Sequence, residues 1–139
     1  MPKAVKSALA GLLVLAAIVL GALYLSQGDA QATSITRAVE DGITVEIRSP
    51  DGPIEVLREN RFTVVLKDAS GQPIRNAKLQ MVMFMPKMYC GDFYAQITET
   101  APGVYEAVGV LPMRGKWKAE LKIDQGGRTA TVSHLFKTE

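Results

Sequence analysis

The amino-acid sequence predicts an all-β domain, an immunoglobulin-like antiparallel sandwich of about seven strands, preceded by one N-terminal apolar helix. Three observations predict this fold. Short segments of alternating apolar and polar residues recur over residues 43–136, Gly and Pro separate them, and no segment after residue 42 keeps a helical period. The chain then divides into residues 1–26, a transmembrane anchor or signal peptide; residues 27–41, a linker; and residues 42–139, the sandwich.

The N-terminal element is the uncharged segment from Ala8 to Leu25, which follows Lys3 and Lys6. It reaches the length at which a helix crosses a bilayer, as a membrane anchor would. The small residues of Ala30 to Ala32 also offer a signal-peptide cleavage site, so both alternatives stay open. In either case the basic residues before the segment place the N-terminus on the cytoplasmic side of the membrane. We therefore expect the domain outside the cytoplasm, periplasmic or extracellular, and a single-pass membrane protein if the segment is retained.

The first half of the domain follows a small, polar linker. Strands are expected at residues 43–48, 61–68 and 74–84, with a short edge piece at 54–57. In the first strand Ile43, Val45 and Ile47 alternate with polar residues. Gly71 and Pro73 supply turn chemistry between the second and third strands. The third strand ends before Pro86, because proline removes a backbone donor.

The second half repeats this pattern with shorter turns. Strands are expected at residues 92–100, 104–110, 116–123 and 128–136. Three turn segments separate them, read as APG, LPMRG and DQGG. Trp117 is the expected core indole, since it is the single tryptophan of the domain.

Charge and residue counts exclude several functions. From Thr33 onward fourteen basic residues face thirteen acidic ones, a net charge of +1, which provides no electrostatic footprint for nucleic acid. The single histidine has no convincing nucleophile partner and no carboxylate pair stands at an interpretable spacing, so we expect no enzyme. Cys90 is the only cysteine and makes no internal disulfide, so it is buried and inert, paired with another chain, or used as a ligand or reactive thiol.

The decapeptide MVMFMPKMYC, residues 81–90, holds four of the six methionines and the cysteine. Met81 and Met83 alternate on an apolar strand and are expected to fill the core. Met85 ends that strand, where packing and metal ligation are equally compatible with its position. Met88 and Cys90 follow in a polar loop with no obvious core to fill.

If each strand crosses the whole sandwich, the turn that contains Met113 returns to the same end as Met85, Met88 and Cys90. Thioether and thiolate donors select Cu(I) over harder divalent ions. The sequence therefore predicts a Cu(I) site formed by these four residues. His134 is expected near the same end and is a reserve ligand, although its apolar strand face is more typical of a core-edge histidine.

Three motifs resemble the YtkA-like and FixH-like family of exported β-sandwich domains: Met-Pro-x-Met at residues 85–88, Pro-Gly-x-Tyr at 102–105 and Pro-Met-x-Gly-x-Trp at 112–117. The resemblance covers about residues 43–136. It implies an exported or membrane-anchored domain associated with copper handling or with assembly of respiratory oxidases. It also implies that Met85, Met88 and Met113 match methionines suspected of binding copper. The loop here reads YCGDF, where related sequences often carry glycine, methionine or histidine.

Two functions follow from these observations. The first is an extracytoplasmic domain that binds Cu(I) and transfers it to a metal-receiving protein. The second is a structural accessory subunit, held by a single membrane helix, that contacts a larger membrane protein complex through the methionine-rich end without a metal.

Overall fold

The computed structural model describes residues 3–25 and 31–139. They form two separate units, one within residues 1–30 and the other over residues 31–139. The first unit contains a single helix, α1, from Lys3 to Leu25. Within the described residues no helix combines the length and the apolar character needed to cross a bilayer. The predicted cleavage site falls partly on residues 26–30, outside the described part of the chain.

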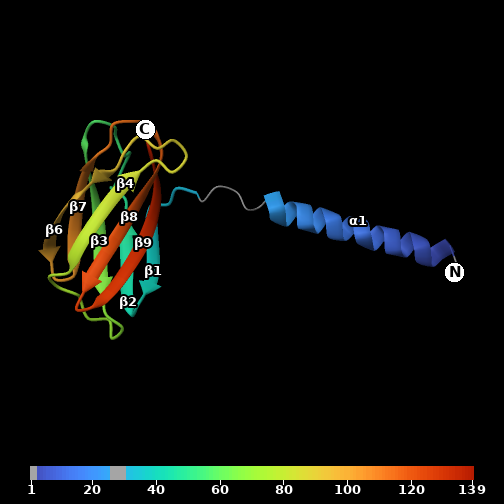
Figure 1. Cartoon of the computed structure of the whole chain (residues 1–139), viewed down its shortest axis with the longest axis horizontal. Helices are drawn as coiled ribbons and strands as arrows, with labels where there is room; N and C mark the ends of the chain where they lie inside the picture. The colour runs from blue at the N-terminus through green and yellow to red at the C-terminus, as the bar shows by residue number, and fades with distance from the viewer. Residues whose placement is uncertain (1–2, 26–30) are drawn as a thin grey trace. The chain divides into compact units, whose positions relative to one another are not determined.

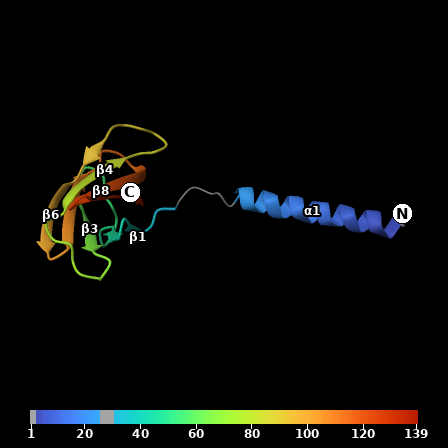
Figure 2. The ribbon, with the colours of Figure 1, turned by 60° about the horizontal axis from the view of Figure 1, so that its bottom comes forward.

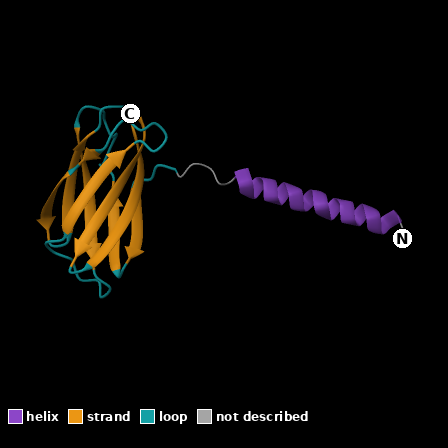
Figure 3. Ribbon diagram, viewed as in Figure 1, coloured by secondary structure: helices purple, strands orange, loops and turns teal. Residues whose placement is uncertain are grey.

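The second unit is a β-sandwich of two antiparallel sheets, which confirms the predicted fold class. Its strands are β1 (Ile35–Glu40), β2 (Ile43–Arg48), β3 (Glu59–Lys67), β4 (Lys78–Phe84), β5 (Phe93–Tyr94), β6 (Gln96–Ala101), β7 (Val104–Val110), β8 (Gly115–Gln125) and β9 (Arg128–Thr138). One sheet has the order β1-β2-β3-β7-β6 and the other the order β5-β4-β8-β9. Figures 1 and 2 show the two layers from different sides, and the loops gather at the two ends of the sandwich (Figure 3).

The sequence prediction differs from the structure at the start of the domain. The linker expected over residues 27–41 contains β1, which pairs with β2 from Ile35↔Arg48 to Glu40↔Ile43. The usual alternation is inverted in this strand: Ile35 and Val39 are exposed, whereas the inward row consists of Thr36 and Ala38. A strand with its larger apolar residues outside does not stand out from a polar tether.

A second difference concerns residues 92–100, which were expected to form one strand. They form β5 in one sheet and β6 in the other, with the change at Ala95, whose amide donates to the Met81 carbonyl over 3.0 Å. The edge piece expected at residues 54–57 is reduced to one parallel bridge between Ile54 and Thr138. Residues 31–139 thus form nine strands instead of about seven, because β1 and the division at Ala95 each add one.

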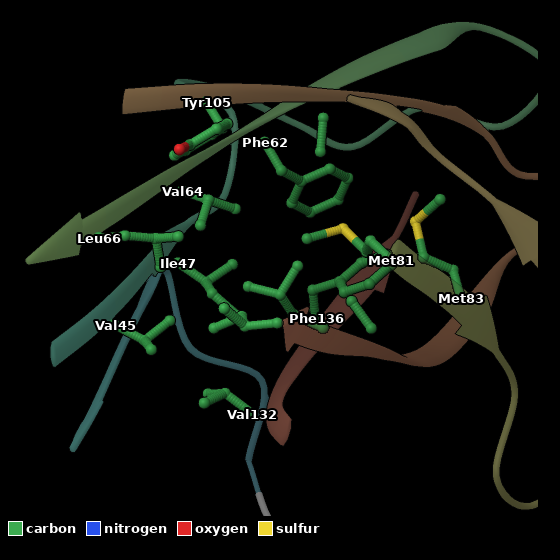
Figure 4. Close-up of a cluster of buried hydrophobic side chains, with 14 of the residues drawn as sticks. Val45, Ile47, Phe62, Val64, Leu66, Met81, Met83, Tyr105, Val132 and Phe136 are labelled. Carbon is green, nitrogen blue, oxygen red and sulfur yellow. The ribbon is translucent and has the colours of Figure 1, made fainter. Parts of the chain in front are cut away.

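The core lies between the sheets and is built from the inward rows of their strands (Figure 4). Met81 and Met83 are fully buried, as their alternation predicts, and so is Trp117. Phe62 contacts Phe136 across the two sheets with ring centroids 5.0 Å apart. Burying such a side chain contributes about 1.5–3 kcal/mol, so this interior holds the domain together without a disulfide.

Candidate metal centre

Two of the residues predicted as ligands, Met85 and Met113, lie at the end of the sandwich where β4 finishes and β8 begins, and Met88 and Cys90 follow in the loop after β4. Phe84 pairs with Lys118, which places the residue after β4 beside the start of β8. An ideal Cβ built at Gly115 would lie 2.5 Å from Cε of Met85. Met113 stands two residues before that glycine, so Met85 and Met113 reach the same end from different strands. We call Met85, Met88, Cys90 and Met113 the methionine-rich end.

The backbone at Met113 is held by hydrogen bonds. Its carbonyl accepts from Nε1 of Trp117 over 3.1 Å and from the hydroxyl of Thr138 over 2.9 Å. The same Thr138 oxygen accepts from the amide of Gly115 over 2.9 Å. These bonds fix the turn between β7 and β8 on a buried indole and on the end of β9. The Pro-Met-x-Gly-x-Trp motif is therefore a turn whose backbone is held by hydrogen bonds to Trp117 and Thr138.

Gly115 has a specific role in this turn. Its φ of +143° lies in a region that side-chain-bearing residues rarely adopt, and the space where a Cβ would stand is taken by the methyl of Met85. Met85 is 5 % exposed and belongs to the core cluster, whereas Met113 is partly buried against that cluster. These two thioethers thus have fixed surroundings.

Met88 and Cys90 have the opposite character. Met88 is 59 % exposed and Cys90 is an exposed free thiol, both in the loop between β4 and β5. Within this loop Asp92 accepts a hydrogen bond from Tyr89, which raises the pKa of that phenol above its usual range. The predicted ligand set is therefore divided into two anchored thioethers and two exposed sulfur groups on a loop.

His134 is placed differently from the reserve ligand expected from the sequence. It pairs with Ala119 of β8, which pairs with Met83 of β4. His134 therefore lies level with Met83, farther from the methionine-rich end than Met85. Its side chain is fully buried. Nδ1 is 2.8 Å from Oγ1 of Thr36, and Nε2 is 2.8 Å from Oγ of Ser49. Both ring nitrogens are thus engaged, and this arrangement offers no nitrogen to a metal at the methionine-rich end.

The surroundings of His134 keep the imidazole neutral. Phe62 and Phe136 flank it, with ring centroids 6.2 Å and 6.1 Å away. Burial lowers the pKa of His134 from 6.5 to about 4, because a charged ring would lose its hydration among these apolar groups. Sequence reasoning missed Thr36 and Ser49 as its partners, since they lie 98 and 85 residues away and carry no local pattern.

Within residues 3–25 and 31–139, no group of three or more His, Cys, Asp or Glu side chains is arranged to hold a metal ion. A site at the methionine-rich end would instead depend on sulfur, with thioethers from Met85, Met88 and Met113 and the Cys90 thiolate. Such a donor set suits Cu(I) and does not suit Mg²⁺ or Ca²⁺, which take oxygen ligands.

The fold and this end define a class: a β-sandwich domain closed at one end by methionines from two separate loops. Over residues 37–122 the chain matches the model of the YtkA-like family, and it belongs to that family. The matched region contains all four residues of the methionine-rich end and stops before His134. The match names the YtkA-like family alone, so the FixH-like part of the resemblance stays a prediction. Comparison with curated proteins finds no match.

Similar solved structures show the fold alone. A DUF4426 family protein from Pseudomonas aeruginosa has 12% identity and a TM-score of 0.57, with 75% of this chain and 94% of that chain covered. The Lin-41 filamin domain has 15% identity and a TM-score of 0.53, with 74% and 96% covered. A DUF4785 family protein from Legionella pneumophila has 15% identity and a TM-score of 0.52, with 70% of this chain covered. The chain spans 28% of the length of that last protein.

Proposed function

We propose that this YtkA-like domain binds one Cu(I) ion through Met85, Met88, Cys90 and Met113 and passes it to a metal-receiving protein without catalysing a reaction. The observation that carries the proposal is the approach of Met85 to the turn of Met113, which brings sulfur from two distant segments to one end. Soft sulfur donors prefer Cu(I).

The division of the donors supports transfer. Met85 is held by the core, and Met113 is held by the hydrogen-bonded turn before β8. Met88 and Cys90 are exposed instead. A partner thiolate has access to the exposed donors and can replace them one at a time. The anchored thioethers would keep the ion in place during that exchange.

The proposal places the domain outside the cytoplasm. The support is the uncharged segment Ala8 to Leu25 after Lys3 and Lys6, which directs export either as a retained anchor or as a cleaved signal. N-terminal sequencing of the protein from a membrane fraction and from a soluble extracytoplasmic fraction separates these two cases. Recovery of the whole chain in the cytoplasm would contradict export.

The decisive experiment is a Cu(I) competition titration of residues 31–139, reduced and anaerobic, against a colourimetric chelator. We expect one equivalent to be retained, and Met88→Ala and Cys90→Ser to lose it. Met85→Leu and Met113→Leu conserve side-chain volume and should fold while binding more weakly, because they remove only the sulfur.

The chain offers a matched control for that titration. Met81 is fully buried and is not one of the proposed ligands, so Met81→Leu should retain the ion. Failure of the folded parent domain to retain copper would contradict the proposal. Equal loss in Met81→Leu would attribute the effect to altered packing of the core.

A second candidate function has its own observation. Besides Met88, three large apolar side chains are exposed in the loops or strand ends next to the methionine-rich end: Leu57, Tyr89 and Val110. Exposed apolar groups of this kind are typical of interfaces. An accessory subunit would use them to contact a larger membrane protein complex without a metal. Co-purification with such a complex that survives copper chelation and fails in Leu57→Asp favours this function.

A further inference from the structure

The two outer faces of the sandwich differ in their basic residues. The outward row of the sheet β1-β2-β3-β7-β6 carries mainly arginines, and these are paired with carboxylates: Arg37 and Arg48 with Glu46, and Arg61 with Glu59 and Glu106. Opposite charges therefore neutralise each other on this face.

The outward row of β4, β8 and β9 carries lysines instead. We call this surface the lysine face; its charged residues are Lys78, Lys116, Lys118, Glu120, Lys122, Asp124 and Lys137. Among the described residues no ion pair involves Lys78, Lys122 or Lys137. Figure 1 shows the three strands side by side.

The charge of the domain is thus separated between its surfaces. The lysine face has five lysines and two carboxylates, a net charge of +3, whereas the remaining nine basic and eleven acidic residues after Thr33 give −2. A domain of net charge +1 concentrates its positive charge on one side. Such a face attracts an extended anionic surface.

Aromatic side chains border one end of this face. Nζ of Lys118 lies 5.8 Å from the ring centroid of Phe84, and Tyr94 on the neighbouring β5 is 59 % exposed. Met88 and Tyr89 follow in the loop beyond β4 and are exposed as well. Amphipathic rings beside lysines are typical of protein surfaces at the interface between lipid headgroups and acyl chains.

The lysine face also contains a shallow hollow. Its volume is about 320 Å³, and its lining comes only from β4, β8 and β9; the charged and hydroxyl residues in the lining are Lys78, Lys122, Thr129 and Thr131, with Asp124 as the one carboxylate. Ammonium and hydroxyl groups around such a hollow are hydrogen-bond donors for a phosphate group.

We propose that the lysine face docks on the surface of a bilayer that contains anionic phospholipids. Lysine suits this role better than arginine, because its compact charge on a flexible stem adapts to a diffuse negative surface and needs no fixed bidentate partner. The occupant is identified by its charge, by the extent of the face over three strands and by the apolar residues at one end. The lysines that carry this docking are not among the residues proposed to bind copper, so docking does not require the ion.

The experiment uses residues 31–139, because the whole described core lies within this unit and the N-terminal apolar segment would itself partition into lipid. Vesicles of 30:70 phosphatidylglycerol and phosphatidylcholine are compared with vesicles of phosphatidylcholine alone, by co-sedimentation at low and at physiological salt. We expect binding to the anionic vesicles only, and weaker binding as salt rises.

Single substitutions test the face itself. Each lysine near an anionic surface contributes about 1 kcal/mol, which is about fivefold in the partition coefficient. Lys122→Gln should therefore lower binding about fivefold, and Lys78→Gln with Lys122→Gln about 25-fold. Lys67→Gln is the control: it removes one positive charge from an exposed position of β3 in the opposite sheet and should leave binding nearly unchanged. Unfolding midpoints of the variants verify that each is folded.

Several outcomes would overturn the proposal. One is the absence of binding to anionic vesicles at low salt, and another is an equal loss in Lys67→Gln. Binding to polyglutamate through Lys78 and Lys122 without binding to vesicles would also overturn it and would assign the face to an acidic polypeptide.

Discussion

Thr36 and His134 meet across the open side of the sandwich, with Oγ1 of the threonine 2.8 Å from Nδ1 of the histidine. Thr36 belongs to β1 at the edge of one sheet, and His134 belongs to β9 at the edge of the other. On the other side of the ring, Ser49 occupies Nε2. The ring on β9 is therefore hydrogen-bonded to two hydroxyl groups of the opposite layer, one on β1 and one directly after β2.

Thr36→Val tests this connection. The substitution keeps the shape of the side chain and leaves Nδ1 of a fully buried ring without its hydroxyl partner. An unsatisfied buried polar group costs about 1–3 kcal/mol, so the free energy of unfolding should fall by that amount. Urea unfolding of residues 31–139 measures it. Thr44→Val on the exposed side of β2 is the control and should stay within about 0.5 kcal/mol.

The pH dependence of stability should also report His134. The pKa of its ring is about 4 in the folded protein and 6.5 when unperturbed, so between these values the unfolded chain binds more protons. Stability is then complete above about pH 6.5 and decreases as the pH falls toward 4, by about 3 kcal/mol in total. Unfolding free energies between pH 4 and 8 measure the slope.

The carboxylates offer an internal comparison for that titration. The pKa values of Glu46 and Asp68 are lowered, chiefly by hydrogen bonds from the side chains of Arg37 and Ser70 respectively. Their contribution is therefore lost only at pH values below the ordinary carboxyl range. In His134→Gln the free energy of unfolding should depend less on pH between 4.5 and 6.5. The loss of stability at lower pH, which comes from the carboxylates, should remain. An unchanged slope would show that the ring does not control it.

A side chain at Gly103 should destabilise the domain more than one at a glycine in open space. It lies in the Pro-Gly-x-Tyr turn with a φ of +71°, and an ideal Cβ there would stand 2.8 Å from the Leu66 carbonyl oxygen and 2.7 Å from Cβ of Pro73. Gly126 has a φ of +58° and nothing within 4 Å of such a Cβ. Gly126→Ala should thus cost about 1–2 kcal/mol for the backbone alone, and Gly103→Ala about 1–3 kcal/mol more. Thermal and urea unfolding of the two variants give the difference, and equal costs would contradict the steric argument.

Tyr105 of the same motif ties the long loop before β4 to β7. Its hydroxyl donates to the Ile74 carbonyl over 2.7 Å and accepts from the Ala77 amide over 3.1 Å. Tyr105→Phe should lower the free energy of unfolding by about 1–3 kcal/mol, since both backbone groups lose their partner. Tyr94→Phe is the control, because Tyr94 is 59 % exposed. An equal loss of stability in both variants would show that the buried hydroxyl of Tyr105 contributes no more than the exposed one of Tyr94.

Sequence reasoning predicts most of the sandwich because its strands alternate regularly. In β2, for example, Ile43, Val45 and Ile47 are fully buried, as their spacing indicates. The pattern fails where the inward row is small, as in β1, and where a strand leaves one sheet for the other at Ala95. The position of β1 and the change of sheet at Ala95 both depend on contacts between segments distant in the sequence. The alternation of residues within one segment carries no information about such contacts.

The candidate site has a similar division. Strand parity predicts that Met113 returns to the end of Met85, because each strand crosses the sheet once. The depth of each sulfur is not predictable in this way: Met85 is buried against Gly115, whereas Met88, three residues further along, is exposed in the loop after β4. For His134 the apolar face indicated a core position, but its hydroxyl partners come from β1 and from the end of β2.

The division of one segment between the sheets at Ala95 has a mechanical consequence. On that side the sheets are joined by peptide bonds, which no fluctuation breaks. On the side of β1 and β9 they are joined by hydrogen bonds, namely those of the His134 ring and one from the Thr33 amide to the Leu135 carbonyl. A partial opening of the domain therefore starts at β1, and it exposes one flank of the interior while the other stays shut. The amide protons of β1 should exchange with solvent earlier than those of β3 and β7, so the sandwich opens in one direction only.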